Sequence, residues 1–349
     1  MSSGQHYRLK VLIIGSGAIG TYVGGQLALD GQHVVFLERP HRVSRFKEEG
    51  IHINISGQVY SGSPPRVVGS LKEGVENGPY DVGIFALKAY HTRDMAEQLA
   101  KIEGPIPPLL CLQNGIGNED ILAQQLGAEA VIPGTITTSV SKTAPGHITV
   151  RKKRGLGVAG GLPLSDRLVG AFRAAGIQAS AYEDSRSMKW TKLVTNLMAN
   201  ASCAILDMPP GEIYADRDLY RLEIKQLREA LAVMRAQGLA PVSLPGIPTK
   251  LLIWIIRSWP PALSQPLLAR VIQGGRGGKM PSFHVDLYGG KTRSEVDFLN
   301  GAVVQAGAQY GVDTPVNDLL KRRLLALVRG EIPLDSYARQ PRKLLGELP

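Results

Sequence analysis

Residues 15–20 hold the feature that most constrains how this chain can fold. They have the form G-x-G-x-x-G, they follow the apolar segment 10–14, and they open a segment with helical character, residues 18–30. Between a strand and a helix, the first glycine permits a tight turn, the second lets the backbone approach a pyrophosphate, and the third lets the helix pack closely on the strand. The helix N-terminus adds amide donors for the phosphates. We therefore predict that a dinucleotide binds at Gly15, Ser16, Gly17, Ala18, Ile19 and Gly20.

Strand and helix patterns alternate through the first half of the 349 residues. Apolar, strand-like segments lie at residues 33–37, 82–87 and 108–112, and residues 119–126 have helical spacing. Such alternation predicts a parallel sheet wound with right-handed crossovers. A chain of this length also exceeds the size at which one hydrophobic core usually keeps growing, so two domains are expected.

The second half is predicted to be helical, because its segments are long and have helical spacing with few strand signals. The strongest candidates are residues 187–206, 218–237 and 295–309. The predicted fold class is α/β: an N-terminal Rossmann-type, doubly wound parallel sheet in residues 1–183, followed by an all-helical C-terminal domain in residues 184–349. Prolines in residues 241–266 and glycines in residues 274–278 predict broken helices and a mobile loop between two of these helices.

Composition and patterning exclude several classes of protein. The net charge is +10, but the densest basic run, residues 151–154, lacks interleaved aromatic residues and is predicted to be a solvated loop. The apolar stretch 251–256 is too short to span a bilayer. Cys111 and Cys203 lie in different halves, which supports neither a disulfide nor a zinc site, and the N-terminus lacks the layout of a secretory signal. We expect a soluble, cytoplasmic protein that binds no nucleic acid, membrane or metal.

The second predicted strand ends at Glu38-Arg39, the position that selects the cofactor in this kind of fold. An acid there would accept the ribose hydroxyls of NAD. An arginine would instead hold the 2'-phosphate of NADP through charge-assisted hydrogen bonds, and Arg42 is near enough in sequence to help. The arginine favours NADP, and the acid keeps NAD as the alternative.

Lys192, Asn196 and Asn200 recur at i, i+4 and i+8 in an otherwise apolar segment, so we expect them on one face of one helix. A polar stripe in such a helix needs partners, because an unpaired ammonium or amide is costly to bury. A polar ligand would provide them. The alternative is that the lysine extends to solvent and the asparagines bond to neighbouring loops.

Three further polar residues lie where a ligand site could form. Asn114 and Lys88 follow strands at the carboxyl edge of the predicted sheet, where ligands bind in open α/β folds, although Asn-Gly is also a common turn and a lone lysine there is usually solvated. Glu295 begins a predicted helix and, with Thr292, matches the T-x-x-E pattern of a capping box. The same carboxylate could instead orient a catalytic lysine.

Taken together, these segments resemble ketopantoate reductases over both halves of the chain. The resemblance rests on the glycine turn, Arg39, LKAY at 87–90, QNGIG at 113–117, the W-x-K-x-x-x-N-x-x-x-N pattern of 190–200, and SEVDFLNG at 294–301 before a G-x-x-T-P-x-N ending. It implies an NADPH-dependent oxidoreductase that reduces the 2-keto acid 2-dehydropantoate (ketopantoate) to pantoate in pantothenate biosynthesis. It also implies a possible homodimer.

The resemblance implies a role for each matching residue. Lys192 would donate a proton to the keto oxygen as the nicotinamide delivers hydride to the same carbon. Asn114 would help to hold both cofactor and substrate. Asn196 and Asn200 would bind the pantoyl hydroxyl end, and Ser282 the carboxylate.

The cofactor would also be met by Lys88, by the backbone at Val140 and by Glu295, which would orient Lys192 as well. The chain departs from the family pattern after Asn200, where it reads ASCAILD instead of an N-P-like step followed by a further asparagine. Reduction of a different 2-keto acid, an opine-type dehydrogenase and a non-catalytic nucleotide sensor are therefore the alternatives.

Overall fold

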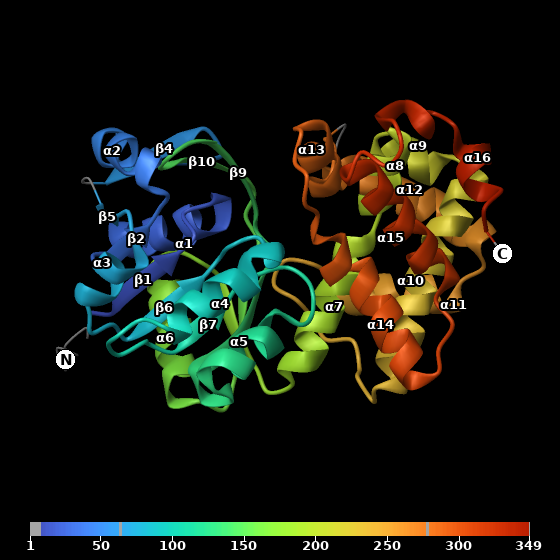
Figure 1. Cartoon of the computed structure of the whole chain (residues 1–349). Helices are drawn as coiled ribbons and strands as arrows, with labels where there is room; N and C mark the ends of the chain where they lie inside the picture. Colours follow the sequence, from blue (N-terminus) through green and yellow to red (C-terminus); the bar gives the residue numbers. More distant parts are fainter. Residues whose placement is uncertain (1–7, 63–64, 277–278, 349) are drawn as a thin grey trace. The chain divides into compact units, whose positions relative to one another are not determined.

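The structure is a computed structural model that describes residues 8–62, 65–276 and 279–348. The chain divides into two compact units, one containing sheets and one helical, drawn mainly in blue to green and in yellow to red in Figure 1. Residues 114–117 belong to the helical unit and residues 244–247 to the sheet unit, although each lies within the other's stretch of sequence. The main change of unit falls between residues 188 and 189, inside helix α7 (Ser185–Leu197). The boundary predicted between residues 183 and 184 lies just before this helix.

The centre of the sheet unit, among the described residues, is an eight-stranded sheet in the order β12-β11-β8-β7-β6-β1-β2-β5. Neighbouring strands pair in parallel except β8 and β11, which are antiparallel. The parallel α/β sheet predicted from the sequence is confirmed. Its strands are β1 (Lys10–Ile14), β2 (His33–Leu37), β5 (Arg66–Val68), β6 (Val82–Phe85), β7 (Leu109–Cys111), β8 (Val131–Ile136), β11 (Leu156–Ala159) and β12 (Ala179–Tyr182).

Helices cover both faces of this sheet because alternate residues of each strand point to opposite sides. In β1, Val11 and Ile13 join the core that includes α1 and α6, whereas Leu12 and Ile14 join the core that includes α4 and α5. The helical segments of the unit are α1 (Ala18–Leu29), α2 (Pro40–Glu49), α3 (Leu71–Glu76), η1 (Ala89–His91), α4 (Thr92–Ala100), α5 (Asn118–Leu126), η2 (Ala128–Ala130) and α6 (Pro163–Ala174).

A second sheet of four strands, in the order β4-β3-β10-β9, was not predicted. Its strands are β3 (Ile51–Ile55), β4 (Gln58–Gly62), β9 (Ser139–Ala144) and β10 (His147–Lys152). The central pair, β3 and β10, is parallel and the outer pairs are antiparallel. This corrects the loop predicted for the basic run, because Arg151 and Lys152 are the exposed last residues of β10.

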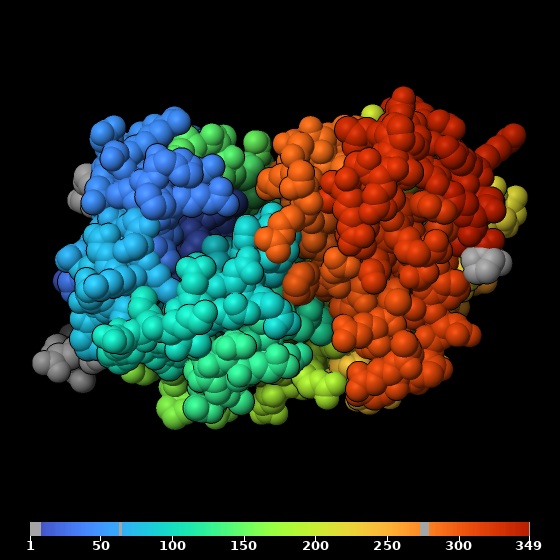
Figure 2. All heavy atoms as spheres, in the orientation of Figure 1, coloured from blue at the N-terminus to red at the C-terminus, as the bar shows by residue number. Residues whose placement is uncertain are grey.

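The second unit is helical, as predicted, and packs around one apolar core that includes Trp190, Leu197, Ile205, Leu227 and Leu320. On the face drawn in Figure 2, its surface consists mostly of the segments from α13 onward. Beyond α7 its helical segments are α8 (Asn200–Leu206), α9 (Pro210–Ala215), α10 (Arg217–Ala236), α11 (Thr249–Ser258), α12 (Pro261–Arg276), α13 (Ser282–Tyr288), η3 (Glu295–Phe298), α14 (Asn300–Tyr310), α15 (Pro315–Val328), η4 (Leu334–Ser336) and α16 (Pro341–Leu345).

Two helices that the sequence predicts as continuous are interrupted. Residues 187–206 form most of α7 and then α8, because Ala199 takes a left-handed conformation with φ 53°. Residues 295–309 form the 3₁₀-helix η3 and then α14, with Leu299 at φ −111° and ψ −90° between them. Both interruptions lie in the segments that hold predicted site residues.

The proline-rich stretch is more regular than predicted. α11 and α12 are separated by Trp259 and Pro260, and α12 includes Pro266 and continues through Gly274 and Gly275. Residues 277 and 278 of the predicted mobile loop lie outside the described residues. Within the described ranges, no helix is both long and apolar enough to cross a membrane.

Candidate active site

The glycine turn between β1 and α1 fits a dinucleotide pyrophosphate. Helix α1 begins at Ala18, and its N-cap, Gly17, provides no side-chain hydrogen bond to the first amides. A Cβ on Gly17 would meet no atom within 4 Å, whereas a Cβ on Gly20 would overlap the carbonyl oxygen of Gly15. The loop is therefore closed on the side of the strand and open above the helix N-terminus, where amide donors for a phosphate lie.

A partly buried ion pair joins this turn to the end of β2. The Nζ atom of Lys142, from β9, lies 3.3 Å from Oε2 of Glu38 and donates to the carbonyl oxygen of Ser16 at 2.5 Å. The other oxygen of Glu38, Oε1, accepts the backbone N–H of Arg39 at 2.9 Å. Burial lowers the pKa of Lys142, and the charge of Glu38 opposes that shift. Sequence reasoning missed Lys142 because 104 residues separate it from Glu38 and it belongs to no motif.

Of the other predicted cofactor residues of the sheet unit, Arg39 and Lys88 follow strands of the central sheet, as expected, and Val140 lies in β9. Arg39 is exposed at the N-terminus of α2, and its carbonyl oxygen accepts the backbone N–H of the exposed Arg42 at 2.8 Å. Lys88 is partly buried and precedes η1, shortly after β6. Val140 is partly buried in β9 and pairs with Val150 of β10. Their cofactor contacts remain predictions.

In the helical unit, three of the predicted polar residues form one chain of hydrogen bonds. Nζ of Lys192 donates to Oδ1 of Asn196 at 2.7 Å, and Nδ2 of Asn196 donates to Oδ1 of Asn114 at 3.0 Å. A lysine ammonium can only donate, so it fixes the orientation of the Asn196 amide, and that amide fixes the Asn114 amide in turn. The side chain of Lys192 is partly buried within an apolar helix, so the array holds a cation in a defined position.

Asn114 reaches this array because its loop packs on η3. The backbone N–H of Ile116 donates to the carbonyl oxygen of Phe298 at 3.0 Å. Gly115 has φ +90°, and a Cβ there would overlap the same carbonyl oxygen. A glycine at position 115 is therefore required for close packing as well as for the turn.

Asn200 is held apart from the Lys192 chain and lies against α13 instead. Its Oδ1 accepts the backbone N–H of Phe283 at 3.1 Å, and its Nδ2 lies 3.4 Å from Oγ of Ser282. Asn200 is 5% exposed, whereas Ser282 is exposed. The prediction that one helix face holds all three polar residues is thus wrong, because the chain turns at Ala199 and α8 starts at Asn200.

The turn at Ala199 is held by Glu223, a residue that sequence reasoning missed. Oε2 of Glu223 accepts the backbone N–H of Ala199 at 2.7 Å, and Oε1 accepts the hydroxyl of Ser202 at 2.6 Å. Glu223 lies on α10 and is fully buried. An acidic residue on an apolar helix face was the signal that could have indicated it, because a buried carboxylate needs donors.

Glu295 is 4% exposed and is the first residue of η3. The capping box predicted for it is wrong, since the N-cap is Ser294, whose hydroxyl accepts the backbone N–H of Val296 at 3.2 Å. Thr292 lies before the cap. The proposed role of Glu295 beside Lys192 remains a prediction.

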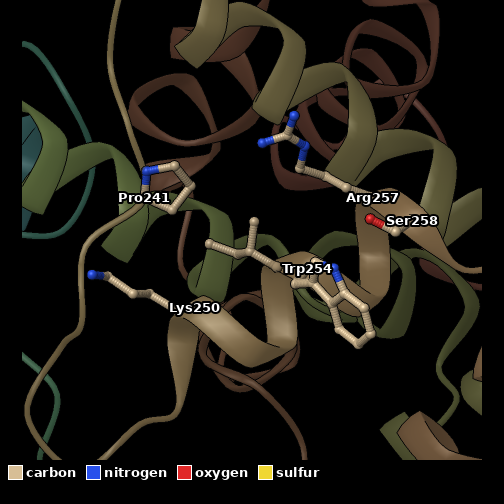
Figure 3. Close-up of a pocket in the computed structure, with 6 residues that line it drawn as sticks. Pro241, Lys250, Trp254, Arg257 and Ser258 are labelled. Carbon is tan, nitrogen blue, oxygen red and sulfur yellow. The ribbon is translucent and has the colours of Figure 1, made fainter.

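A separate cavity on α11 contains none of these residues. Its volume is about 280 Å³, and it is lined by Pro241, Lys250, Ile253, Trp254, Arg257 and Ser258. Figure 3 shows the side chains of Lys250, Trp254 and Arg257 around it. The predicted site residues of the helical unit lie on α7, α8, α13, η3 and the 114–117 loop instead.

A glycine turn open to a phosphate, and a partly buried lysine bonded to one amide that a second amide orients, are features of a dinucleotide-dependent oxidoreductase. Comparison with known proteins narrows this class. Residues 11–160 match the family described as ketopantoate reductase PanE/ApbA, and residues 184–328 match the C-terminal part of the same family. The chain therefore belongs to the ketopantoate reductase family, and it is an NADP-dependent oxidoreductase.

Individual relatives agree with this assignment. A 2-dehydropantoate 2-reductase of Archaeoglobus fulgidus is 28% identical over 330 residues, which cover 92% of this chain and 97% of the relative. The crystal structure of a PanE/ApbA family ketopantoate reductase from Ralstonia eutropha JMP134 has a TM-score of 0.77 at 26% identity, covering 93% of this chain and 99% of the other. The ternary structure of a D-mandelate dehydrogenase with NADH and anilino(oxo)acetate has a TM-score of 0.75 at 21% identity, covering 92% of this chain and 99% of the other, and shows likeness of fold.

Proposed function

We propose that this protein reduces 2-dehydropantoate to pantoate with NADPH. The observation that carries the proposal is the chain of hydrogen bonds from Lys192 through Asn196 to Asn114, which holds an ammonium group in a fixed position. The family assignment and the named relatives support the same reaction. The relative named D-mandelate dehydrogenase makes an aromatic 2-keto acid the second candidate substrate.

When bound, NADPH supplies the hydride that reduces C2 of the keto acid. Lys192 then has two tasks, because its ammonium stabilises the negative charge that develops on the keto oxygen and transfers a proton to it. Asn196 keeps the ammonium in place by accepting one of its hydrogens. Asn114 fixes Asn196 in turn, so this part of the site is oriented before substrate binds.

We assign the substrate carboxylate to Ser282 and the substrate hydroxyl to Asn196 and Asn200. The cofactor is assigned to Arg39, Lys88, Asn114, Val140 and Glu295. Asn200 supports its part of this assignment because its Oδ1 is used by Phe283, which directs its Nδ2 toward Ser282. Glu295 is proposed to orient Lys192. A homodimer is also part of the proposal, and sedimentation velocity of the purified chain tests it.

The reaction is tested by following NADPH oxidation with 2-dehydropantoate, pyruvate, 2-ketoisovalerate and phenylglyoxylate, with NADH in parallel. We expect the highest kcat/KM for 2-dehydropantoate with NADPH. Faster turnover of phenylglyoxylate would favour the second candidate. Tight NADPH binding without turnover of any keto acid would contradict the proposed reaction and favour a nucleotide sensor.

The role of Lys192 is tested by Lys192→Ala, for which we expect kcat to fall by about 10²- to 10⁴-fold, the usual contribution of a positioned acid. Lys225→Ala, which removes an exposed lysine of α10 in the same unit, is the control. A folded Lys192→Ala enzyme with full turnover would show that another group donates the proton.

A further inference from the structure

The end of β2 contains an acid that most dinucleotide folds would use for NAD. Glu38 directly follows β2, where a carboxylate ordinarily accepts the ribose hydroxyls of NAD. A carboxylate at that place also opposes the binding of a 2'-phosphate, because both are anionic. Yet this chain is an NADP-dependent oxidoreductase, so the charge of Glu38 must be offset.

Both oxygens of Glu38 are already used within the protein. Oε1 accepts the backbone N–H of Arg39 at 2.9 Å, and Oε2 lies 3.3 Å from Nζ of Lys142. The side chains of Glu38 and Lys142 are 7% and 19% exposed, so solvent screens this pair weakly. In this arrangement Glu38 does not present a bare carboxylate to a ribose.

Lys142 also ties the two cofactor-binding segments together. Its ammonium donates to the carbonyl oxygen of Ser16 in the glycine turn at 2.5 Å, while it pairs with Glu38 at the end of the neighbouring strand. One side chain from the second sheet therefore fixes the position of the glycine turn relative to the end of β2. Arg39 and Arg42 remain as exposed cations at the start of α2.

We propose that Lys142 is a cofactor-selecting residue: by pairing with Glu38 it removes that carboxylate from ribose recognition and leaves Arg39 and Arg42 to define a subsite for the 2'-phosphate. This inference rests on the proposed function for the cofactor role of Arg39. Lys142 acts through Glu38 and Ser16, so it is a positioning residue. Without it, Glu38 would repel a 2'-phosphate and accept ribose hydroxyls, which shifts the preference toward nucleotides that lack this phosphate.

The test measures binding of nucleotide fragments to the full-length protein by isothermal titration calorimetry. Adenosine 2',5'-bisphosphate and AMP differ by the 2'-phosphate alone, and neither carries a nicotinamide. We expect the wild-type protein to bind the bisphosphate more tightly. Lys142→Met should reduce the ratio of the two affinities by at least about tenfold, because an anion is then left beside the phosphate.

Three further variants separate selection from general damage. In Glu38→Gln/Lys142→Met both charges are absent, and we expect the preference of the wild-type protein to return. Lys152→Met removes an exposed lysine of β10 and should change neither affinity. Glu38→Gln alone releases Lys142 from its partner, so the preference for the bisphosphate should rise. If Lys142→Met does not fold, this variant provides the test of cofactor selection.

The inference is overturned if Lys142→Met keeps the preference of the wild-type protein, or if it loses affinity for both fragments equally, which would mean that Lys142 only supports the loop. It is also overturned if the preference in Glu38→Gln stays constant or falls, or if the wild-type protein prefers AMP. No keto acid is present in these titrations, so an absence of 2-dehydropantoate turnover would refute the proposed reaction and leave this readout unaffected.

Discussion

Replacing Glu223 by alanine should strongly destabilise the helical unit, because this carboxylate holds the turn between α7 and α8. The substitution removes the acceptor of the Ala199 N–H, at 2.7 Å, of the Ser202 hydroxyl, at 2.6 Å, and of the Gln226 side-chain amide, at 3.0 Å, which keeps a second acceptor in the carbonyl oxygen of Leu197. Hydrogen bonds to a charged group contribute about 1.5 to 3 kcal/mol each, and a buried N–H left without an acceptor costs about 1 to 3 kcal/mol. The Ser202 hydroxyl can find another acceptor, so we expect a loss of about 3 to 5 kcal/mol in the free energy of unfolding.

Glu223→Gln is a milder change at the same position. Its carbonyl oxygen can still accept the Ala199 N–H, and its amide can donate to the Ser202 oxygen. The charge assistance is lost, so we expect a decrease of about 1 to 2 kcal/mol. The order of stability should therefore be wild type, then the glutamine variant, then the alanine variant.

Urea unfolding followed by tryptophan fluorescence measures this loss in the correct part of the chain. All three tryptophans, Trp190, Trp254 and Trp259, belong to the helical unit. Linear extrapolation of the transition gives the free energy of unfolding in water. The fluorescence signal therefore reports on the unit that contains the substitution.

The matched control is Glu212→Ala, which removes an exposed carboxylate paired with Arg339 at 2.9 Å. Exposed ion pairs contribute little, so we expect a change below about 1 kcal/mol. A loss of less than about 1 kcal/mol in Glu223→Ala itself would refute the reasoning that the buried carboxylate sustains the turn.

Three other substitutions have distinct expected outcomes. Ala199→Gly should change the stability of the helical unit by less than about 1 kcal/mol, because glycine adopts φ 53° without strain but the methyl group that it removes is fully buried, and a loss above about 2 kcal/mol would contradict this. Burial raises the pKa of Glu229, so the folded state binds the proton of this carboxyl group more tightly than the unfolded state does. The resulting stabilisation is present at pH values below the usual pKa of a glutamate. It is lost as the pH rises through the raised pKa of the folded state. In Glu229→Gln, this contribution to the pH dependence of the free energy of unfolding should be absent, as a pH series would show. An identical pH dependence in both proteins would contradict the prediction. Gly20→Ala would place a Cβ on the Gly15 carbonyl oxygen, so calorimetry should find NADP binding weakened by at least about 100-fold, equivalent to about 2.7 kcal/mol, while the tryptophan-monitored transition stays constant.

The parts of the fold that were predictable are those specified by local sequence. Strand β1 and the glycine turn are contiguous, and their apolar run and glycines determine the start of the sheet. The break at Ala199 was not predictable, because alanine is the strongest helix former and the cause of the break, Glu223, lies 24 residues away. For the same reason Lys142 was not predictable as the partner of Glu38, because the two residues are 104 positions apart.

In the candidate site, too, the features set by local sequence were predictable and those set by distant residues were not. The i, i+4 spacing of Lys192 and Asn196 correctly indicated two side chains that meet, because α7 is regular between them. Adding Asn200 at i+8 failed, since it assumed that the helix continues. Ser282 and Asn200 are 82 residues apart, and their proximity was expected only from the resemblance to the family.

The two short segments that belong to the opposite unit have a consequence for how this protein can be cut and recombined. The carbonyl oxygen of Pro245 accepts the hydroxyl of Thr137 at 2.8 Å, and residues 114–117 provide Asn114 to the lysine array. A gene fragment that stops at residue 183 would lack Pro245, and one that starts at residue 184 would lack Asn114. The units are therefore poor cassettes for domain exchange between relatives, and a chimaera would need four junctions around these segments in addition to the one in α7.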